Sequence, residues 1–142
     1  MKKVLFILVL LFLSVDAFAQ NPEFAKRVDD SINLIKNGKI EEGLAFLIGE
    51  NSILYEKVFG SAVTKNTQVS QILAFQNAYG KLLNAELVWS QTAGKVTNQW
   101  YMLYHENYPM VLDIVFYELD GKIFVIKYKF EETAEDIPSA IY

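Results

Sequence analysis

The fold of this 142-residue chain is decided by residues 109–131, PMVLDIVFYELDGKIFVIKYKFE. Two runs rich in β-branched and aromatic residues, at about 109–118 and 122–131, flank the pair Asp120-Gly121. An Asp-Gly pair between two such runs predicts a β-hairpin with a two-residue turn. We therefore expect two antiparallel strands here.

The turn also predicts which residues lie opposite one another, because partners move away from it in equal steps. The expected pairs are Tyr117 with Phe124, Val115 with Ile126, and Asp113 with Tyr128. One face then carries Val111, Val115, Tyr117, Phe124, Ile126, Tyr128 and Phe130. The other carries Met110, Leu112, Ile114 and Phe116 beside Ile123, Val125, Lys127 and Lys129. Both faces are largely apolar, so the residues leave open which one meets the helices.

Towards the N-terminus the pattern changes from strands to helices. Period-two alternation predicts two more strands, at about 85–92 and 96–105. Apolar residues at helical spacing predict three helices, over 22–36, 40–48 and 67–83. A further short helix could be lined by Ile53, Leu54, Val58 and Phe59. All helices precede all strands, so we expect an α+β fold with three N-terminal helices packed on a curved four-stranded antiparallel sheet.

The first nineteen residues have the layout of a secretory signal peptide. A lysine pair precedes the ten-residue apolar run Val4–Leu13, and Ala17-Phe18-Ala19 supplies the small residues of a cleavage site. We expect cleavage after Ala19 and export of a bacterial protein to the periplasm or beyond. Residues 20–132 then form a single α+β domain, followed by an acidic C-terminal tail at 133–142.

Composition excludes several classes of protein. The chain has no cysteine, which excludes disulfides, a thiolate nucleophile, a zinc–cysteine site and a lipid-modified N-terminal cysteine. Its formal net charge is −4, with 13 basic and 17 acidic residues. An acidic surface repels phosphate backbones, so we expect no nucleic-acid partner. The apolar run near the N-terminus is too short for a permanent membrane span.

Three features of spacing point to a known architecture. These are the helix hairpin around Asn37-Gly38-Lys39, the Tyr79-Gly80 step into the first strand, and the closing pair around Asp120-Gly121-Lys122. Over about residues 22–132 the layout resembles small exported bacterial members of the NTF2-like (SnoaL-like) and cystatin-like superfolds. The resemblance implies a cone with a pocket between helices and sheet. Such folds host isomerases, dehydratases, transport adaptors and domains without known activity. The Gln-x-Val-x-Gly loop of inhibitory cystatins is absent.

One group of residues would suit catalysis. Enzymes of this group that are similar to ketosteroid isomerase use an acidic base and a Tyr-plus-acid oxyanion pair inside the pocket. Here Asp113 lies mid-strand, with Tyr128 predicted opposite it and Tyr117 four positions away. The single histidine, His105, could act as a general base because imidazole titrates near neutrality. For Asp113 and His105 the alternative roles are structural ones, at the surface or in packing.

Aromatic residues gather in the middle of the expected sheet. Trp89, Trp100, Tyr104 and Tyr117 are candidates for lining a ligand pocket, since such pockets are commonly aromatic. Core packing would explain the same residues. The chain has no nucleotide-binding glycine loop, no hydrolase elbow and no metal-ligand pattern, so we expect no cofactor and no metal.

We expect an exported, non-catalytic domain that binds a small apolar ligand or a protein partner, with a homodimer through the sheet as one form of that contact. The first alternative is a cofactor-free isomerase or dehydratase whose pocket acid is Asp113. The second is a TPR-like helical interaction module at residues 23–60, where one Gly-Lys-x-Glu-Glu-Gly-Leu-Ala turn occurs. The residues alone leave these alternatives open.

Overall fold

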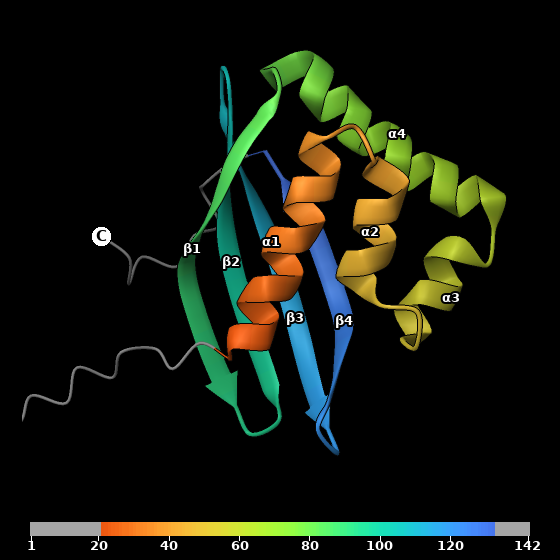
Figure 1. Cartoon of the computed structure of the whole chain (residues 1–142), viewed down its shortest axis with the longest axis vertical. Coiled ribbons are helices and arrows are strands. Elements are labelled where there is room, and N and C mark those ends of the chain that lie inside the picture. Colours follow the sequence, from red (N-terminus) through yellow and green to blue (C-terminus); the bar gives the residue numbers. More distant parts are fainter. Residues whose placement is uncertain (1–20, 133–142) are drawn as a thin grey trace, which may run out of the picture.

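The computed structural model describes residues 21–132, whose arrangement is shown in Figure 1. Within them the elements are α1 (Pro22–Lys36), α2 (Ile40–Ile48), α3 (Ile53–Phe59), α4 (Ala62–Tyr79), β1 (Leu82–Ala93), β2 (Val96–His105), β3 (Pro109–Leu119) and β4 (Lys122–Glu131). The predicted signal peptide, its cleavage site after Ala19 and the acidic tail at 133–142 lie outside the described residues.

The four strands form one antiparallel sheet in the order β1-β2-β3-β4, and the helices precede it in sequence. The predicted α+β class is therefore confirmed. The short helix whose formation the sequence left open is α3. Helix α4 begins at Ala62 rather than at 67, because Ser61 caps it by accepting a hydrogen bond from the backbone N–H of Thr64 at 3.5 Å. Leu83, which we placed in this helix, belongs to β1.

Helices α1 and α2 form a hairpin with a close approach between them. Asn21 caps α1 by accepting a hydrogen bond from the backbone N–H of Glu23 at 3.0 Å. Across the hairpin, the hydroxyl of Ser31 donates to the carbonyl oxygen of Gly43 at 2.8 Å. A Cβ atom on Gly43 would stand 2.7 Å from Cγ1 of Ile35. The absence of a side chain at Gly43 is therefore what allows the two helices to approach this closely.

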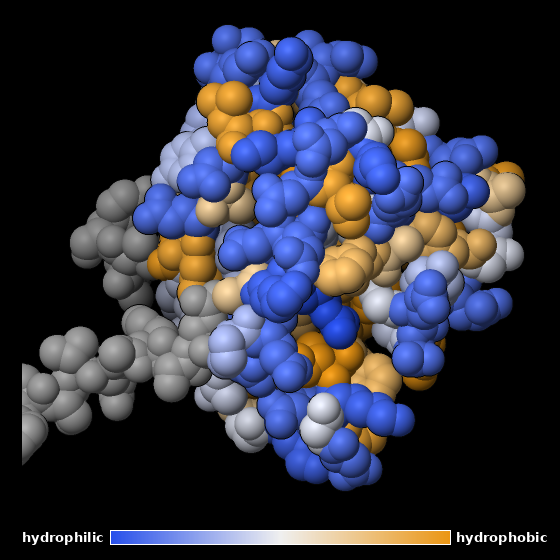
Figure 2. All heavy atoms as spheres, in the orientation of Figure 1, coloured by the Kyte–Doolittle hydropathy of each residue, from blue (hydrophilic) through white to orange (hydrophobic). Residues whose placement is uncertain are grey.

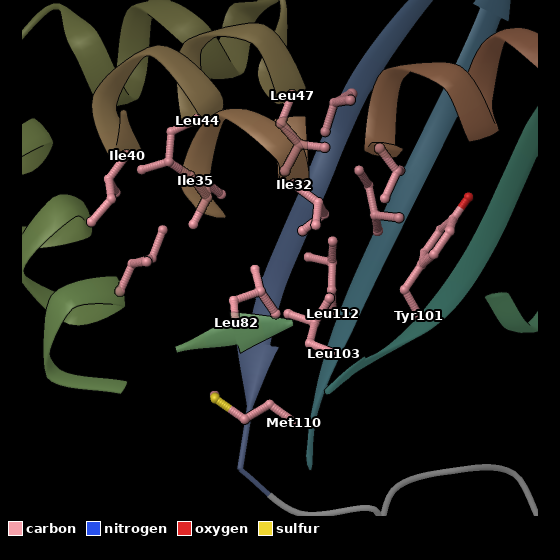
Figure 3. Packing of buried hydrophobic residues seen from close by; sticks show 14 of the residues in the cluster. Ile32, Ile35, Ile40, Leu44, Leu47, Leu82, Tyr101, Leu103, Met110 and Leu112 are labelled. Carbon is pink, nitrogen blue, oxygen red and sulfur yellow. The ribbon is translucent and has the colours of Figure 1, made fainter. Parts of the chain in front are cut away.

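The core lies between this hairpin and one face of the sheet (Figure 3). Its side chains include Ile32, Ile35, Ile40, Leu44 and Leu47 from the helices and Leu82, Tyr101, Leu103, Met110 and Leu112 from the sheet. At the start of α1, the rings of Phe24 and Phe116 stack with centroids 4.3 Å apart. We call this side of the sheet the helix-facing side. The opposite side is the outer face, and none of the described helices covers it (Figure 1).

The turn between β3 and β4 forms as predicted. Asp120 and Gly121 have φ angles of 51° and 71°, and positive values at both positions are those of a type I′ turn. Next to the turn, Tyr117 lies opposite Phe124, which confirms that part of the predicted register.

Further from the turn the predicted register is wrong. Strand β4 contains a β-bulge at Ile126, an extra residue without a counterpart in β3. Beyond the bulge, Asp113 lies opposite Lys129, and Tyr128 lies opposite Ile114. Asp113 and Tyr128 are therefore not cross-strand partners and lie on opposite sides of the sheet.

The bulge has a clear physical reason. An extra residue reverses the direction of every later side chain, because side chains alternate along a strand. Tyr128 and Phe130 consequently pack against the core, while Lys127 and Lys129 lie on the outer face. Uninterrupted alternation would have buried two ammonium groups in place of two aromatic rings, which is energetically costly.

Strand β1 contains two further register shifts, one at Leu83 near its start and one at Val88. Leu87 and Trp89 pair with consecutive residues of β2, so Val88 is the extra residue. Simple alternation from Leu87 would turn Trp89 towards the helices. The bulge turns Ser90 towards them instead and leaves Trp89 on the outer face.

Deletion of Ile126 tests the bulge. Because Ile126 has no counterpart in β3, its deletion leaves Tyr128 and Phe130 facing the core and Lys127 and Lys129 facing outwards, now in a regular strand. We expect the free energy of unfolding to fall by about 1 kcal/mol or less. Tyr128→Lys keeps the chain length but turns an ammonium group towards the core, so its cost should be about 2 kcal/mol or more. Denaturant titration followed by tryptophan fluorescence measures both, and equal losses of stability would contradict the bulge.

Candidate functional site

The four aromatic residues predicted to line a ligand site share the outer face. Trp89 and Trp100 lie side by side in the same row as Asp113, with ring centroids 5.5 Å apart and planes inclined by 59°. Tyr104 lies on this face towards one end, and Tyr117 lies towards the other end, where it also lines a hollow beside α3 (Ile53–Phe59). The aromatic residues therefore form a surface on the side of the sheet away from the helices.

Asp113 is buried near the centre of the outer face. Its residue is 6 % exposed, and its Oδ2 accepts a hydrogen bond from Nζ of Lys127 at 2.5 Å. This ion pair compensates a charge whose burial alone would be costly. The other carboxylate oxygen, together with Nε1 of Trp100 and Oδ1 of Asn98, is buried without a hydrogen-bond partner among residues 21–132.

Tyr128 lies on the other side of the sheet. Its hydroxyl donates a hydrogen bond to Oε1 of Gln68 in α4 at 3.0 Å. Burial raises the pKa of Tyr128 to about 12, because the apolar surroundings disfavour the phenolate. The phenol is therefore neutral at physiological pH and ties α4 to the sheet.

His105 lies at the end of β2, half-buried beside a small cavity of about 10 Å³ between helices and sheet. Burial lowers the pKa of His105, and a hydrogen bond with the backbone of Leu103 opposes that shift. Its Nδ1 is buried and has no hydrogen-bond partner in the described part of the chain. Asp113, Tyr128 and His105 thus occupy three separate environments, and the structure does not bring them together.

A different set of residues surrounds the cavity between helices and sheet. This cavity of about 360 Å³, which we call the polar cavity, lies between the start of α1 and the turn ends of the two hairpins. It is lined by Asn21, Phe24, Ser90, Thr92, Gly94, Lys95, Thr97, Gln99, Glu118 and Asp120. Hydroxyl and amide side chains dominate its wall. Of the three charged residues, Lys95 and Asp120 stand on the hairpin turns, and Glu118 lies near the end of β3, where it accepts a hydrogen bond from Asn21.

Gln99 organises the inner wall of the polar cavity. It is fully buried, and its Oε1 accepts a hydrogen bond from the hydroxyl of Tyr101 at 2.9 Å. Its Nε2 donates to the hydroxyl of Ser90 at 3.4 Å. The hydroxyls of Thr92 and Thr97 are 2.9 Å apart. These groups can donate and accept hydrogen bonds, and they do not ionise near neutral pH, so the wall is suited to binding an uncharged polar molecule.

The residues of this wall were not among those predicted from the sequence. Thr97 and Gln99 alternate with outward residues and continue into Tyr101 and Leu103, so a change from apolar to polar along one face was visible in β2. Ser90 could not be found in the same way, because the bulge before it reverses the alternation.

Among residues 21–132, no three His, Cys, Asp or Glu side chains are grouped so that they could hold a metal ion. None of helices α1–α4 is long and apolar enough to cross a membrane. Comparisons with protein-family models, curated proteins and solved structures found no significant match to this chain. The resemblance to NTF2-like and cystatin-like folds therefore stays a prediction.

The environment of Tyr128 predicts a loss of stability at alkaline pH. Its folded pKa of about 12 lies above the ordinary value of 10.0, so the stabilisation by the neutral phenol is complete below pH 10 and is lost as the pH rises towards 12. Tyr128→Phe should make the unfolding free energy fall less steeply over this range. Denaturant titrations at several pH values measure the slope. Tyr108→Phe, which removes an exposed phenol, is the control, and an equal effect of both substitutions would contradict the assignment.

Proposed function

We propose that this chain is an exported, non-catalytic domain that binds a small, uncharged, polyhydroxylated molecule in the polar cavity. The observation that carries the proposal is the buried amide of Gln99, set among the hydroxyls of Ser90, Thr92 and Thr97. Export rests on the signal-peptide pattern of residues 1–19. A pocket between helices and sheet also agrees with the resemblance to NTF2-like folds.

The chemistry of the cavity favours such a ligand over the apolar one expected from the sequence. A hydroxylated molecule can both donate to and accept from Gln99 and the hydroxyls, which an apolar molecule would leave without partners. The ring of Phe24 offers one apolar wall against which the carbon skeleton of such a ligand can pack. A volume of about 360 Å³ lies within the range of small-molecule pockets.

The two alternatives have less support. An isomerase or dehydratase with Asp113 as its acid would need further groups beside it, and Tyr128 lies across the sheet from it. The TPR-like module would use the hairpin of α1 and α2, whose apolar sides are occupied by the core. Both stay predictions.

Ligand binding in the polar cavity can be tested by thermal unfolding in the presence of monosaccharides and polyols. A ligand of this class should raise the midpoint of unfolding, because it binds only the folded protein. Thr97→Val and Ser90→Ala each remove one hydroxyl, so we expect either to weaken binding by about tenfold.

Thr67→Val is the matched control, because the Thr67 hydroxyl bonds the backbone of its own helix away from the cavity. The proposed function would be contradicted if no uncharged polyol stabilised the protein. It would also be contradicted if all three variants bound the ligand equally well.

We also propose that the outer face binds a second copy of this chain. The supporting observation is the aromatic pair of Trp89 and Trp100 on a face that the described helices leave uncovered. Glu86 lies towards the β1 edge of this face and Lys127 towards the β4 edge. A two-fold axis parallel to the strands would place the β1 edge of one copy over the β4 edge of the other.

Sedimentation of the purified protein tests this contact. We expect a dimer whose dissociation constant rises by about tenfold or more in Trp89→Ser, because aromatic residues dominate interface energies. Ile53→Ser, on the helix side of the molecule, should leave the dimer unchanged. A protein that stays monomeric at all accessible concentrations would exclude the homodimer.

A further inference from the structure

An apolar groove runs along the β4 edge of the sheet, beside α2 and α3. It consists of two adjoining hollows of about 540 Å³ and 380 Å³ that share Asn51, Ser52 and Phe124. The first lies between α1, α2 and β4, and the second lies between α3 and the turn end of β3 and β4. Figure 2 shows apolar atoms at the surface in this region, below the helices.

The groove collects much of the exposed apolar surface of the described residues. Nine large hydrophobic side chains are exposed, and four of them border the groove: Phe46, Ile53, Leu119 and Ile126. Ile53 is 80 % exposed although it begins a helix that packs on the rest of the fold. Contiguous apolar surface of this kind marks a binding site more often than isolated exposed residues do.

Arg27 places a half-buried cationic group at the α1 end of this groove, whereas Lys57, at the rim of the other end, is exposed to solvent. The guanidinium of Arg27 is half-buried against Gly49, and Nη1 donates a long hydrogen bond of 3.4 Å to the carbonyl oxygen of Ile123. Among the described residues it forms no ion pair with a carboxylate. Burial lowers the pKa of Arg27, and nearby Glu23 opposes that shift without forming a contact pair. Most of its donor N–H groups thus stay available to an anion.

The two acidic residues that line the groove, Glu42 and Glu50, do not pair with the guanidinium of Arg27. Glu42 pairs with Lys39 at 3.2 Å, and Glu50 is exposed at the rim. A ligand that matches the groove therefore carries one anionic group at the end that meets Arg27. The rest of the ligand is apolar, because the groove continues past Phe124 to exposed aliphatic side chains.

We propose that the groove binds a free fatty acid, with its carboxylate on Arg27 and its hydrocarbon chain laid over Phe124 towards Ile53 and Ile126. A guanidinium can bind a carboxylate through two parallel hydrogen bonds, which fixes the end of the chain. The proposal does not depend on the polar cavity, because the two sites share no lining residue.

Displacement of the fluorescent fatty acid cis-parinaric acid from the purified protein tests this site. Palmitic acid should displace the probe at a concentration about tenfold lower than hexadecanol, because only the acid can pair with the guanidinium. Arg27→Gln should remove this preference, and Arg27→Lys should keep part of it. Ile53→Ser should weaken the binding of the acid and of the alcohol equally, because it removes only apolar contact.

Lys26→Gln is the matched control. Lys26 is the exposed neighbour of Arg27 on the same helix and pairs with Asp30, so its loss should leave the preference for the acid intact. If Arg27→Gln does not fold, the comparison of palmitic acid with hexadecanol on the unchanged protein still tests whether the groove prefers a carboxylate. The proposal would be overturned if the acid and the alcohol displaced the probe equally, or if neither displaced it. It would also be overturned if Ile53→Ser made a dimer of the protein dissociate.

Discussion

One extra residue in β4 governs the composition of both faces of the sheet. Because Ile126 is bulged, the strand presents Val125, Tyr128 and Phe130 to the helices and Lys127 to the outer face. Without the bulge, the helices would have no continuous apolar surface to pack on along this strand. The position of α4 depends on it as well, since the hydroxyl of Tyr128 meets Gln68 only from the helix-facing side.

The bulge at Val88 has a comparable effect at the other edge. It brings the hydroxyls of Ser90 and Thr92 under the start of α1, next to Thr97 and Gln99 of β2. The helix-facing side is therefore apolar where α1 and α2 pack and polar near the hairpin turns. Through the bulges at Val88 and Ile126, the sheet holds a hydrophobic core and a hydrogen-bonding cavity on one side.

Much of the fold could be predicted from the sequence, because its signals are local. Asp120-Gly121 predicted the turn, and the spacing of Phe24, Val28, Ile32 and Ile35 predicted the buried side of α1. The candidate site could not be predicted in the same way. Val88 and Ile126 are β-branched residues of the kind that fills ordinary strands, so neither announces a bulge. One unseen insertion was enough to place Tyr128 beside Asp113 incorrectly.

The stacking of Phe24 on Phe116 joins the first described helix to the third strand. Neighbouring strands of the sheet are also neighbours in sequence, so the sheet can assemble from successive hairpins with short loops to close. The apolar sides of α1 and α2, by contrast, have no sheet to cover them until the strands have been made. We therefore expect the helical segment to gain lasting structure late, when the hairpins present a surface on which it can condense.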